Sequence, residues 1–310
     1  ENFSDLRTSW RYKECEKCGK KRGFVFVNNY QRRRKMAEHK NVVLASTEKS
    51  GADIQFPAID VADKDFFFLP FNMKIADGLL KTSLATPLCT LNNQRKAYVF
   101  YSAAKPAGSL AEKNSSVCSA KDASASLYQF EGDAPDCDIV TLSREDALNA
   151  HKVFANGKEY LVVTDSVLFQ NNQDGKTELE FEDCKKISFK AFPELEKVPE
   201  GFSAKKCGGG FTVYTFDQDA AESPKVSCQK ISEDEKTAVY KISVENWQNG
   251  LDDLFVDIGY AGNCARLYEN GKLIDDGIFV GENYPWSIGF KRYGKNAHDF
   301  TLEIDSLKKD

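Results

Sequence analysis

The sequence has few of the residues on which nucleophilic catalysis and metal binding depend. Only three His occur in 310 residues, at positions 39, 151 and 298, and no Gly-x-Ser-x-Gly segment is present. A nucleophilic Ser or Cys needs a nearby base, most often His, so a Ser or Cys triad has little support. Neither a metal ion nor an organic cofactor is predicted.

Long apolar runs are also missing. The apolar cluster from Phe66 to Phe71 is far shorter than the roughly 20 residues that a membrane-spanning helix needs. The start of the chain, Glu1 to Arg7, lacks the basic segment and the apolar core of a secretory signal. We therefore expect no membrane contact, and we expect the chain to be a piece of a longer protein.

Cysteine is present, but not in the pattern of a small secreted domain. Nine Cys, an odd number, are scattered over the whole length, whereas secreted domains carry dense, even sets. This distribution predicts reduced thiols and a cytoplasmic location. Cys15 and Cys18 have the spacing of half a zinc knuckle, but no second ligand pair follows, so a reduced hairpin turn is favoured over a zinc or redox site.

Positive charge is not in excess. The chain has 42 Lys and Arg against 47 Asp and Glu, which gives a net charge of −5. Nucleic acid is therefore not predicted as a partner. The basic run Arg32 to Lys35 could suit a polyanion, but a solvated face or an inter-domain ion-pair surface fits the acidic chain better.

Aromatic and β-branched clusters dominate what is present, with 22 Phe and 12 Tyr. Residues of this kind favour strands, and Gly, Asn and Asp separate the clusters as turns would. Asn156-Gly157 and Asn270-Gly271 are strong hairpin signals, as is Asp174-Gly175. The strand candidates are 23–27, 65–69, 97–101, 159–163, 211–216 and 238–244.

These patterns predict a mostly-β chain of two to three antiparallel β-sandwich domains. A short helix is expected near 143–151, where Ser143 precedes an acidic residue at the capping-box spacing. The alternation of strand and helix that a TIM barrel needs is missing. Polar, small-residue stretches place the domains at 1–105, 106–235 and 236–310. In the last, Leu267 and Leu273 are expected to point inward, with Glu269 and Lys272 in solvent.

Several acidic groups could pass for catalytic carboxylates. They are Glu282, which precedes Asn283, and the groups Asp252-Asp253 with Asp257 and Asp275-Asp276. Glycoside hydrolysis needs two carboxyl groups about 5 to 10 Å apart, which sequence cannot establish, and acidic pairs are common on solvated loops. The Gly208-Gly209-Gly210 run lacks the Lys-Ser/Thr of a phosphate loop and is expected to be a bulge or turn.

Trp286 and Tyr284 could form an aromatic platform for a sugar ring. Flat aromatic faces stack on the C–H groups of a pyranose, while neighbouring polar groups bind its hydroxyls. The alternative is a place in the core or at a domain interface, and we expect Trp286 to be buried.

Several stretches together resemble the region that follows the barrel in bacterial β-galactosidases of glycoside hydrolase family 35. In chain order they are 23–31 with 36–42, 66–73 with 85–89, 143–152 with 158–165, and 265–274 with 285–289. They span nearly the whole chain.

The resemblance implies a role without catalysis. In the family, the acid/base and nucleophile Glu residues belong to a barrel that precedes this region, so no residue here inherits a catalytic role. The resemblance also implies that the last domain is a galactose-binding-like jelly roll. We therefore expect a C-terminal β-sandwich region of a β-galactosidase-like enzyme, inactive alone, whose partner is the catalytic barrel of the same parent chain.

Two other functions stay open at this stage. One is a stand-alone carbohydrate-binding module that binds galactosides through Trp286 and Tyr284. The other is a complete glycosidase that uses Glu282 or the Asp pairs.

Overall fold

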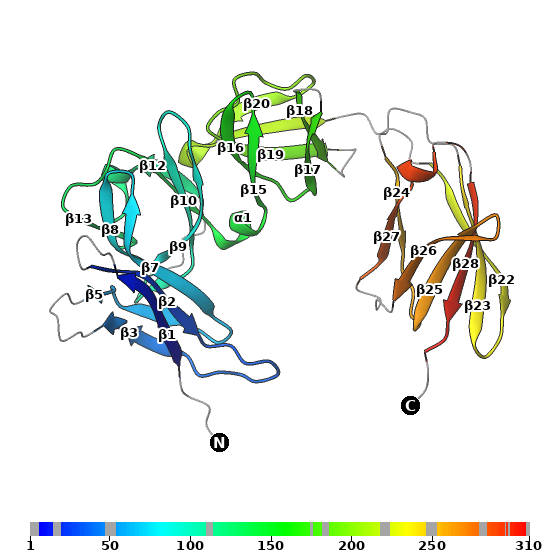
Figure 1. Ribbon diagram of the computed structural model, residues 1–310, viewed down its shortest axis with the longest axis horizontal. Coiled ribbons are helices and arrows are strands. Elements are labelled where there is room, and N and C mark those ends of the chain that lie inside the picture. Colours follow the sequence, from blue (N-terminus) through cyan, green and yellow to red (C-terminus); the bar gives the residue numbers. More distant parts are fainter. Residues whose placement is uncertain are drawn as a thin grey trace. The chain divides into compact units, whose positions relative to one another are not determined.

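The structure is a computed structural model, and it describes residues 6–14, 20–46, 54–109, 114–173, 176–181, 186–217, 224–245, 253–278, 284–294, 296 and 298–307. Strands dominate it, in several antiparallel sheets (Figure 1). The predicted fold class, mostly β with several β-sandwich domains, is confirmed. The chain divides into two compact units, residues 1–217 (unit 1) and 218–310 (unit 2).

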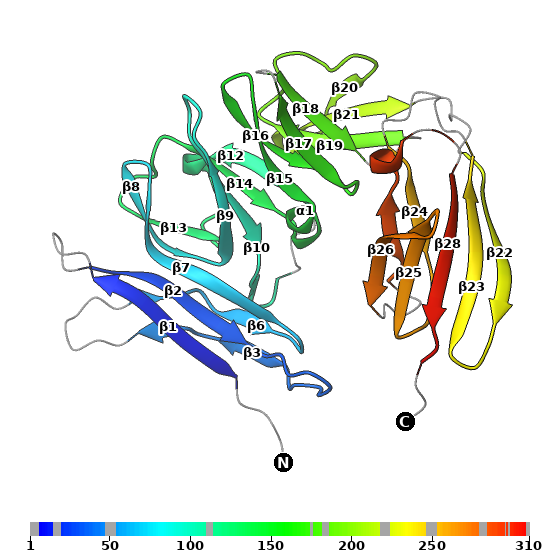
Figure 2. The same cartoon turned by 45° about the vertical axis from the view of Figure 1, so that its right-hand side comes forward.

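Unit 1 begins with a five-stranded sheet (Figures 1 and 2). Its strands, in spatial order, are β1 (Arg7–Glu14), β2 (Lys21–Asn28), β7 (Phe66–Ile75), β8 (Gly78–Ser83) and β13 (Tyr128–Glu131). Successive side chains of a strand point to opposite faces, and Val25, Val27, Phe67 and Leu69 all point to the buried one. This alternation is why the sequence folds here as strands with one face in a core.

The remaining sheets of the first half of unit 1 pack against that core. One has four strands, β12 (Ser116–Ser119), β14 (Asp138–Leu142), β10 (Ala97–Ser102) and β9 (Ala85–Leu91). A small sheet joins β11 (Lys105–Pro106), β6 (Ile59–Val61) and β3 (His39–Val42), and another joins β4 (Ala45–Ser46) and β5 (Ile54–Gln55). A 3-10 turn, η1, covers Ala120–Asp122.

The second half of unit 1 is a second sandwich. Its five-stranded sheet is β15 (Ala150–Ala155), β16 (Lys158–Val163), β19 (Lys186–Phe192), β21 (Thr212–Asp217) and β20 (Ser203–Lys206), with η2 (Gly208–Gly210) before β21. A two-stranded sheet contains β17 (Leu168–Gln173) and β18 (Lys176–Phe181). A shared apolar cluster that includes Val99, Leu142, Leu161 and Phe211 joins the two halves.

The predicted helix is shorter than expected. Helix α1 covers Arg144–Leu148, and the Ser143 hydroxyl accepts a hydrogen bond from the Asp146 N–H at 3.0 Å, as a capping residue does. His151 lies in β15 instead, because that strand pairs with β16 across the Asn156-Gly157 turn. The first strand of the hairpin therefore begins at Ala150, inside the range predicted as helix.

Unit 2 is a β-sandwich of unequal sheets. The larger has the order β22 (Val226–Glu233), β23 (Thr237–Val244), β28 (His298–Asp305), β25 (Cys264–Glu269) and β26 (Lys272–Ile278). The smaller pairs β24 (Phe255–Ile258) with β27 (Trp286–Gly289), and η3 (Lys291–Tyr293) follows. The core between them is built from both sheets, as in Ile242, Val256, Leu267, Ile288 and Phe300.

The chain divides at different places from those that composition suggests. The boundary expected near residue 105 falls between β10 and β12, which both pair with β14 in one sheet. The boundary expected near 235 falls in the turn that joins β22 to β23, whereas the two units meet at 217/218. Polar composition marks exposed segments. Because an exposed turn within a sandwich is as polar as a linker between domains, composition does not distinguish the two.

The hairpin at Asn270-Gly271 forms as expected, with both residues at positive φ (50° and 78°). Leu267 is fully buried, as predicted, and Lys272 is exposed. The prediction for Leu273 is wrong, because this side chain is 46% exposed. Because Asn270 and Gly271 form a two-residue turn, Leu273 lies opposite Tyr268, whose side chain points to the other face from Leu267, and so Leu273 points away from the core.

These two leucines make a matched pair for a stability test of unit 2. We predict that Leu267→Ala lowers the free energy of unfolding of unit 2 by about 2–5 kcal/mol, the usual result of opening a cavity in a core. Leu273→Ala should change it by less than about 1 kcal/mol. Urea unfolding measured by circular dichroism checks both values, and equal losses would contradict the observed register.

Candidate functional site

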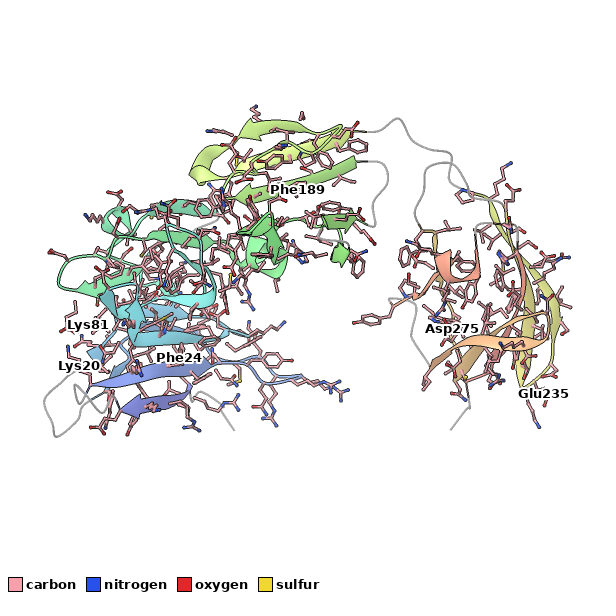
Figure 3. All side chains as sticks on the ribbon, turned by 45° about the horizontal axis from the view of Figure 1, so that its top comes forward. Lys20, Phe24, Lys81, Phe189, Glu235 and Asp275 are labelled. Atoms are coloured by element: carbon pink, nitrogen blue, oxygen red, sulfur yellow. The ribbon has the colours of Figure 1, made fainter. Side chains whose placement is uncertain are left out.

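A group of exposed and half-buried aromatic rings lies on the outer face of strands β2 and β7 and just beyond β2. We call this group the β2–β7 aromatic surface, and it consists of Phe24, Phe26, Tyr30, Phe66 and Phe68. Figure 3 labels Phe24 on this sheet. Phe68 lies 5.4 Å from Phe24 and 5.6 Å from Phe26 between ring centroids, and Tyr30 lies 6.1 Å from Phe66.

The pairing of β2 with β7 puts these rings together. Phe26 lies directly opposite Phe68, and Asn28 opposite Phe66, while Val27 and Phe67 form a buried pair between them on the other face. An outer face normally carries polar side chains. Here Phe26 is 42% exposed and Phe66 57% exposed, so apolar rings occupy a face that contacts water.

Guanidinium groups border this surface. Arg11 lies opposite Phe24 in the β1–β2 pair, and the Arg144 guanidinium carbon is 5.7 Å from the centre of the Phe66 ring. The Arg7 guanidinium donates a hydrogen bond to the Tyr30 carbonyl at 2.6 Å. The basic run 32–35, just after Tyr30, is exposed, as the solvated-face interpretation expects.

A buried amide fixes the segment that carries Tyr30. Asn29 is fully buried, and its side-chain N–H groups donate to the carbonyls of Ala37 and Ala62, each at 2.8 Å. Its backbone N–H donates to the Asp65 carbonyl at 2.7 Å. The exposed ring next to it is therefore presented by a backbone that tertiary hydrogen bonds hold in place.

The two predicted sugar-binding residues lie in unit 2, at and before the start of β27. Trp286 is half-buried rather than buried, and its ring packs edge-on against Tyr260 at 6.3 Å. Tyr284 is 70% exposed. The Trp286 ring therefore packs mainly against the sandwich, whereas the Tyr284 ring lies mainly in solvent.

Two of the acidic candidates that the structure describes, Asp253 and Asp275, have structural partners. The Asp253 carboxylate accepts hydrogen bonds from the backbone N–H groups of Leu254 and Lys291, both at 2.7 Å. Asp275 forms an ion pair with Arg292. Asp257 and Asp276 are exposed, and Asp252 and Glu282 lie outside the described residues. The described residues contain no group of three His, Cys, Asp or Glu positioned to hold a metal ion.

The glycine run is a turn, as expected. Gly209 and Gly210 both have positive φ (80° and 81°), and a Cβ on Gly209 would lie 2.4 Å from the Ser115 carbonyl oxygen. Only glycine permits this conformation and this close approach together. The Gly208–Gly210 turn therefore packs against the segment that begins β12, and the sequence after it enters strand β21.

The six cysteines in the described part of the chain are free thiols. Cys228 is exposed on β22, whereas Cys137 is fully buried, and burial raises the pKa of its thiol to about 11. Cys15 and Cys18 lie outside the described residues, so their predicted turn stays a prediction.

The contrast between two of these thiols predicts their reactivity. At pH 8, we expect Cys228 to react with Ellman's reagent in the folded protein and Cys137 to react only after unfolding, because the thiolate is the nucleophile. Stopped-flow absorbance measurements on Cys228→Ser and Cys137→Ala assign the fast and slow steps of the thiol reaction. A fast step that persists in Cys228→Ser but disappears in Cys137→Ala would contradict the structure.

Comparison with the models of known protein families and with curated proteins finds no match to this chain. In the described part of the chain, no helix has the length and apolar character needed to cross a membrane. The candidate site is therefore defined only by the arrangement of its residues in the structure. Sequence reasoning identified β2 and β7 as strands but missed their aromatic surface, although the alternation of Phe with Val at 24–27 was the available signal.

Proposed function

We propose that this chain is the non-catalytic β-sandwich region of a β-galactosidase-like glycoside hydrolase. In this proposal it supports the catalytic barrel of the same parent chain and borders its substrate cleft. Unit 2 corresponds to the jelly-roll-like last domain of that region. The isolated chain is then expected not to hydrolyse a chromogenic β-galactoside.

The observation that supports this proposal best is the β2–β7 aromatic surface. Two of the stretches that resemble family 35, residues 23–31 and 66–73, contain all five rings of this surface. An exposed contiguous apolar surface with a polar border is typical of a protein–protein contact. Burying one Phe side chain contributes roughly 1.5–3 kcal/mol, so several rings together can hold a domain in place.

The border of the surface indicates the charge of what covers it. Arg11 and Arg144 flank the rings, and the exposed basic run 32–35 follows Tyr30. A barrel face with apolar side chains at its centre and Asp or Glu around them would complement this arrangement.

Substitution within the parent enzyme tests this contact. We predict that Phe26→Asp lowers the melting temperature of the parent enzyme and its kcat/KM for a β-galactoside, because a charge would enter an apolar interface. Phe169→Asp, which changes an exposed ring of β17, is the matched control and should change neither.

The same two variants of the isolated chain separate docking from folding. Both should melt like the unchanged chain, since both rings are exposed here. The docking proposal is wrong if Phe26→Asp and Phe169→Asp behave alike in the parent enzyme, or if the coding region upstream of Glu1 encodes no barrel.

A stand-alone carbohydrate-binding module is the second candidate function. It is favoured by the exposure of Tyr284 beside a half-buried Trp286, since one exposed ring can stack on a sugar while its neighbour anchors the strand. If this function holds, calorimetric titration should show saturable galactose binding that Tyr284→Ala abolishes without changing the melting temperature. The enzyme-region proposal predicts no heat of binding in this titration.

A further inference from the structure

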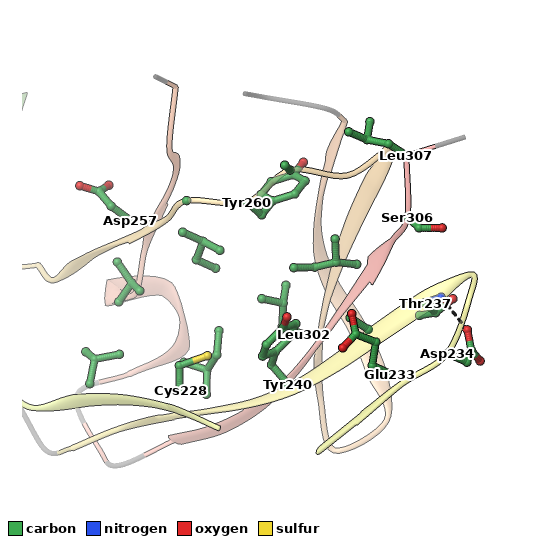
Figure 4. A pocket seen from close by; sticks show the side chains of 18 residues that line it. Cys228, Glu233, Asp234, Thr237, Tyr240, Asp257, Tyr260, Leu302, Ser306 and Leu307 are labelled. Carbon is green, nitrogen blue, oxygen red and sulfur yellow. Dashed lines mark hydrogen bonds between the residues drawn. The ribbon is translucent and has the colours of Figure 1, made fainter. Parts of the chain in front are cut away.

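Unit 2 contains an apolar groove of about 610 Å³ between its two sheets (Figure 4). We call it the β22–β24 groove. Its floor comes from β22, β23 and β28, and one wall comes from β24 and the segment after it, up to Ala261. The side chains on the floor are Val226, Cys228, Ala238, Tyr240, Ile242, Leu302 and Ile304.

The groove exists because the sandwich is unequal. Five strands of one sheet face only two described strands of the other, and the buried core that they share contains residues of β23, β25 and β28 but none of β22. Val226 points to the same face as its buried partner Val244, yet it is 45% exposed. The inner face of β22 therefore has the apolar side chains of a core position without a strand above them.

The wall of the groove is a sheet edge. Among the described strands β24 pairs only with β27, so its other edge faces the groove. The N–H and C=O groups on such an edge can pair with an added strand. An extended segment placed there would gain backbone hydrogen bonds and would set every second side chain against the floor.

The charged side chains that line the groove are all acidic. Its lining contains the carboxylates of Glu233, Asp234 and Asp257 and no Lys or Arg. Lys230 pairs with Glu233 at 2.7 Å, and Asp234 accepts hydrogen bonds from the N–H groups of its own turn. Asp257 is exposed on β24, and the described residues form no hydrogen bond or ion pair with its carboxylate.

We propose that the β22–β24 groove binds an extended peptide segment that adds to the free edge of β24. The segment has apolar side chains at alternate positions, which contact Val226, Cys228 and Tyr240, and a Lys or Arg that pairs with Asp257. The binding is independent of any contact of unit 1 with a barrel. The largely aliphatic floor favours the apolar side chains of such a peptide.

A fluorescent peptide tests this site on the full chain. The probe has about six residues, the length of an ordinary strand, in which Val alternates with Thr, followed by one Lys. We expect saturable binding by fluorescence anisotropy. A peptide of the same composition with Pro at the positions that face β24 should not bind, since Pro has no N–H to donate.

Two exposed residues of β22 provide the matched variants. Val226→Glu places a charge on the groove floor and should weaken binding at least about tenfold, which is roughly 1.4 kcal/mol. Ile231 is 58% exposed on the same strand but lies outside the lining, so Ile231→Glu should leave the affinity unchanged. Replacing the peptide Lys by Glu should weaken binding to the unchanged chain and have a smaller effect on Asp257→Asn.

Equal melting temperatures of the two Glu variants show that any difference between them comes from the groove. The proposal is overturned if no peptide binds, if the Pro peptide binds equally well, or if the two variants bind alike. It is also overturned if sedimentation shows that the unchanged chain dimerises and Val226→Glu makes it monomeric, because a second copy would then be the occupant.

Discussion

The pairing of β2 with β7 is the constraint on which unit 1 depends. Both strands alternate large apolar side chains on both faces, so a single register gives a buried face with Val25 and Leu69 and an outer face with Phe26 and Phe68. A slip of one residue would exchange the two faces. The strands that build the core are thus also the ones that present the aromatic surface.

The units differ in how completely their sheets are covered. In unit 1, the apolar cluster that includes Val99 and Phe211 joins two sandwiches into one unit, and the exposed apolar rings lie outside it. In unit 2, the described strands leave part of the floor of a sandwich uncovered beside the edge of β24. The described carboxylates Asp253 and Asp275 cap or pair with neighbouring groups.

Much of the fold follows from local patterns in the sequence. The strand candidates, the Asn156-Gly157 and Asn270-Gly271 turns and the Ser143 cap depend on neighbouring residues alone, and all of them form. The orientation of Leu273 also follows from a local feature, because the two-residue turn pairs it with Tyr268 on the face opposite to Leu267. The unit boundary depends on which distant strands pair, and polar composition does not report such pairing.

The candidate site was harder to predict for the same reason. Trp286 was expected to be buried because large aromatic side chains usually are, but it lies where the short β24–β27 sheet ends, and so it is half-buried. The aromatic surface needs two strands that are separated by nearly 40 residues to pair in register. The alternation of Phe with Val indicates a strand with two apolar faces, and only the pairing shows that four Phe rings share one exposed face.

Our central proposal is that the catalytic barrel of a parent enzyme covers the β2–β7 aromatic surface. Carbene footprinting with mass spectrometry measures this directly, since the reagent labels side chains that contact water. Phe26 and Phe66 should be labelled in the isolated chain and protected in the parent enzyme, while Phe169 should be labelled equally in both. Equal labelling of Phe26 and Phe66 in the two proteins would contradict the account.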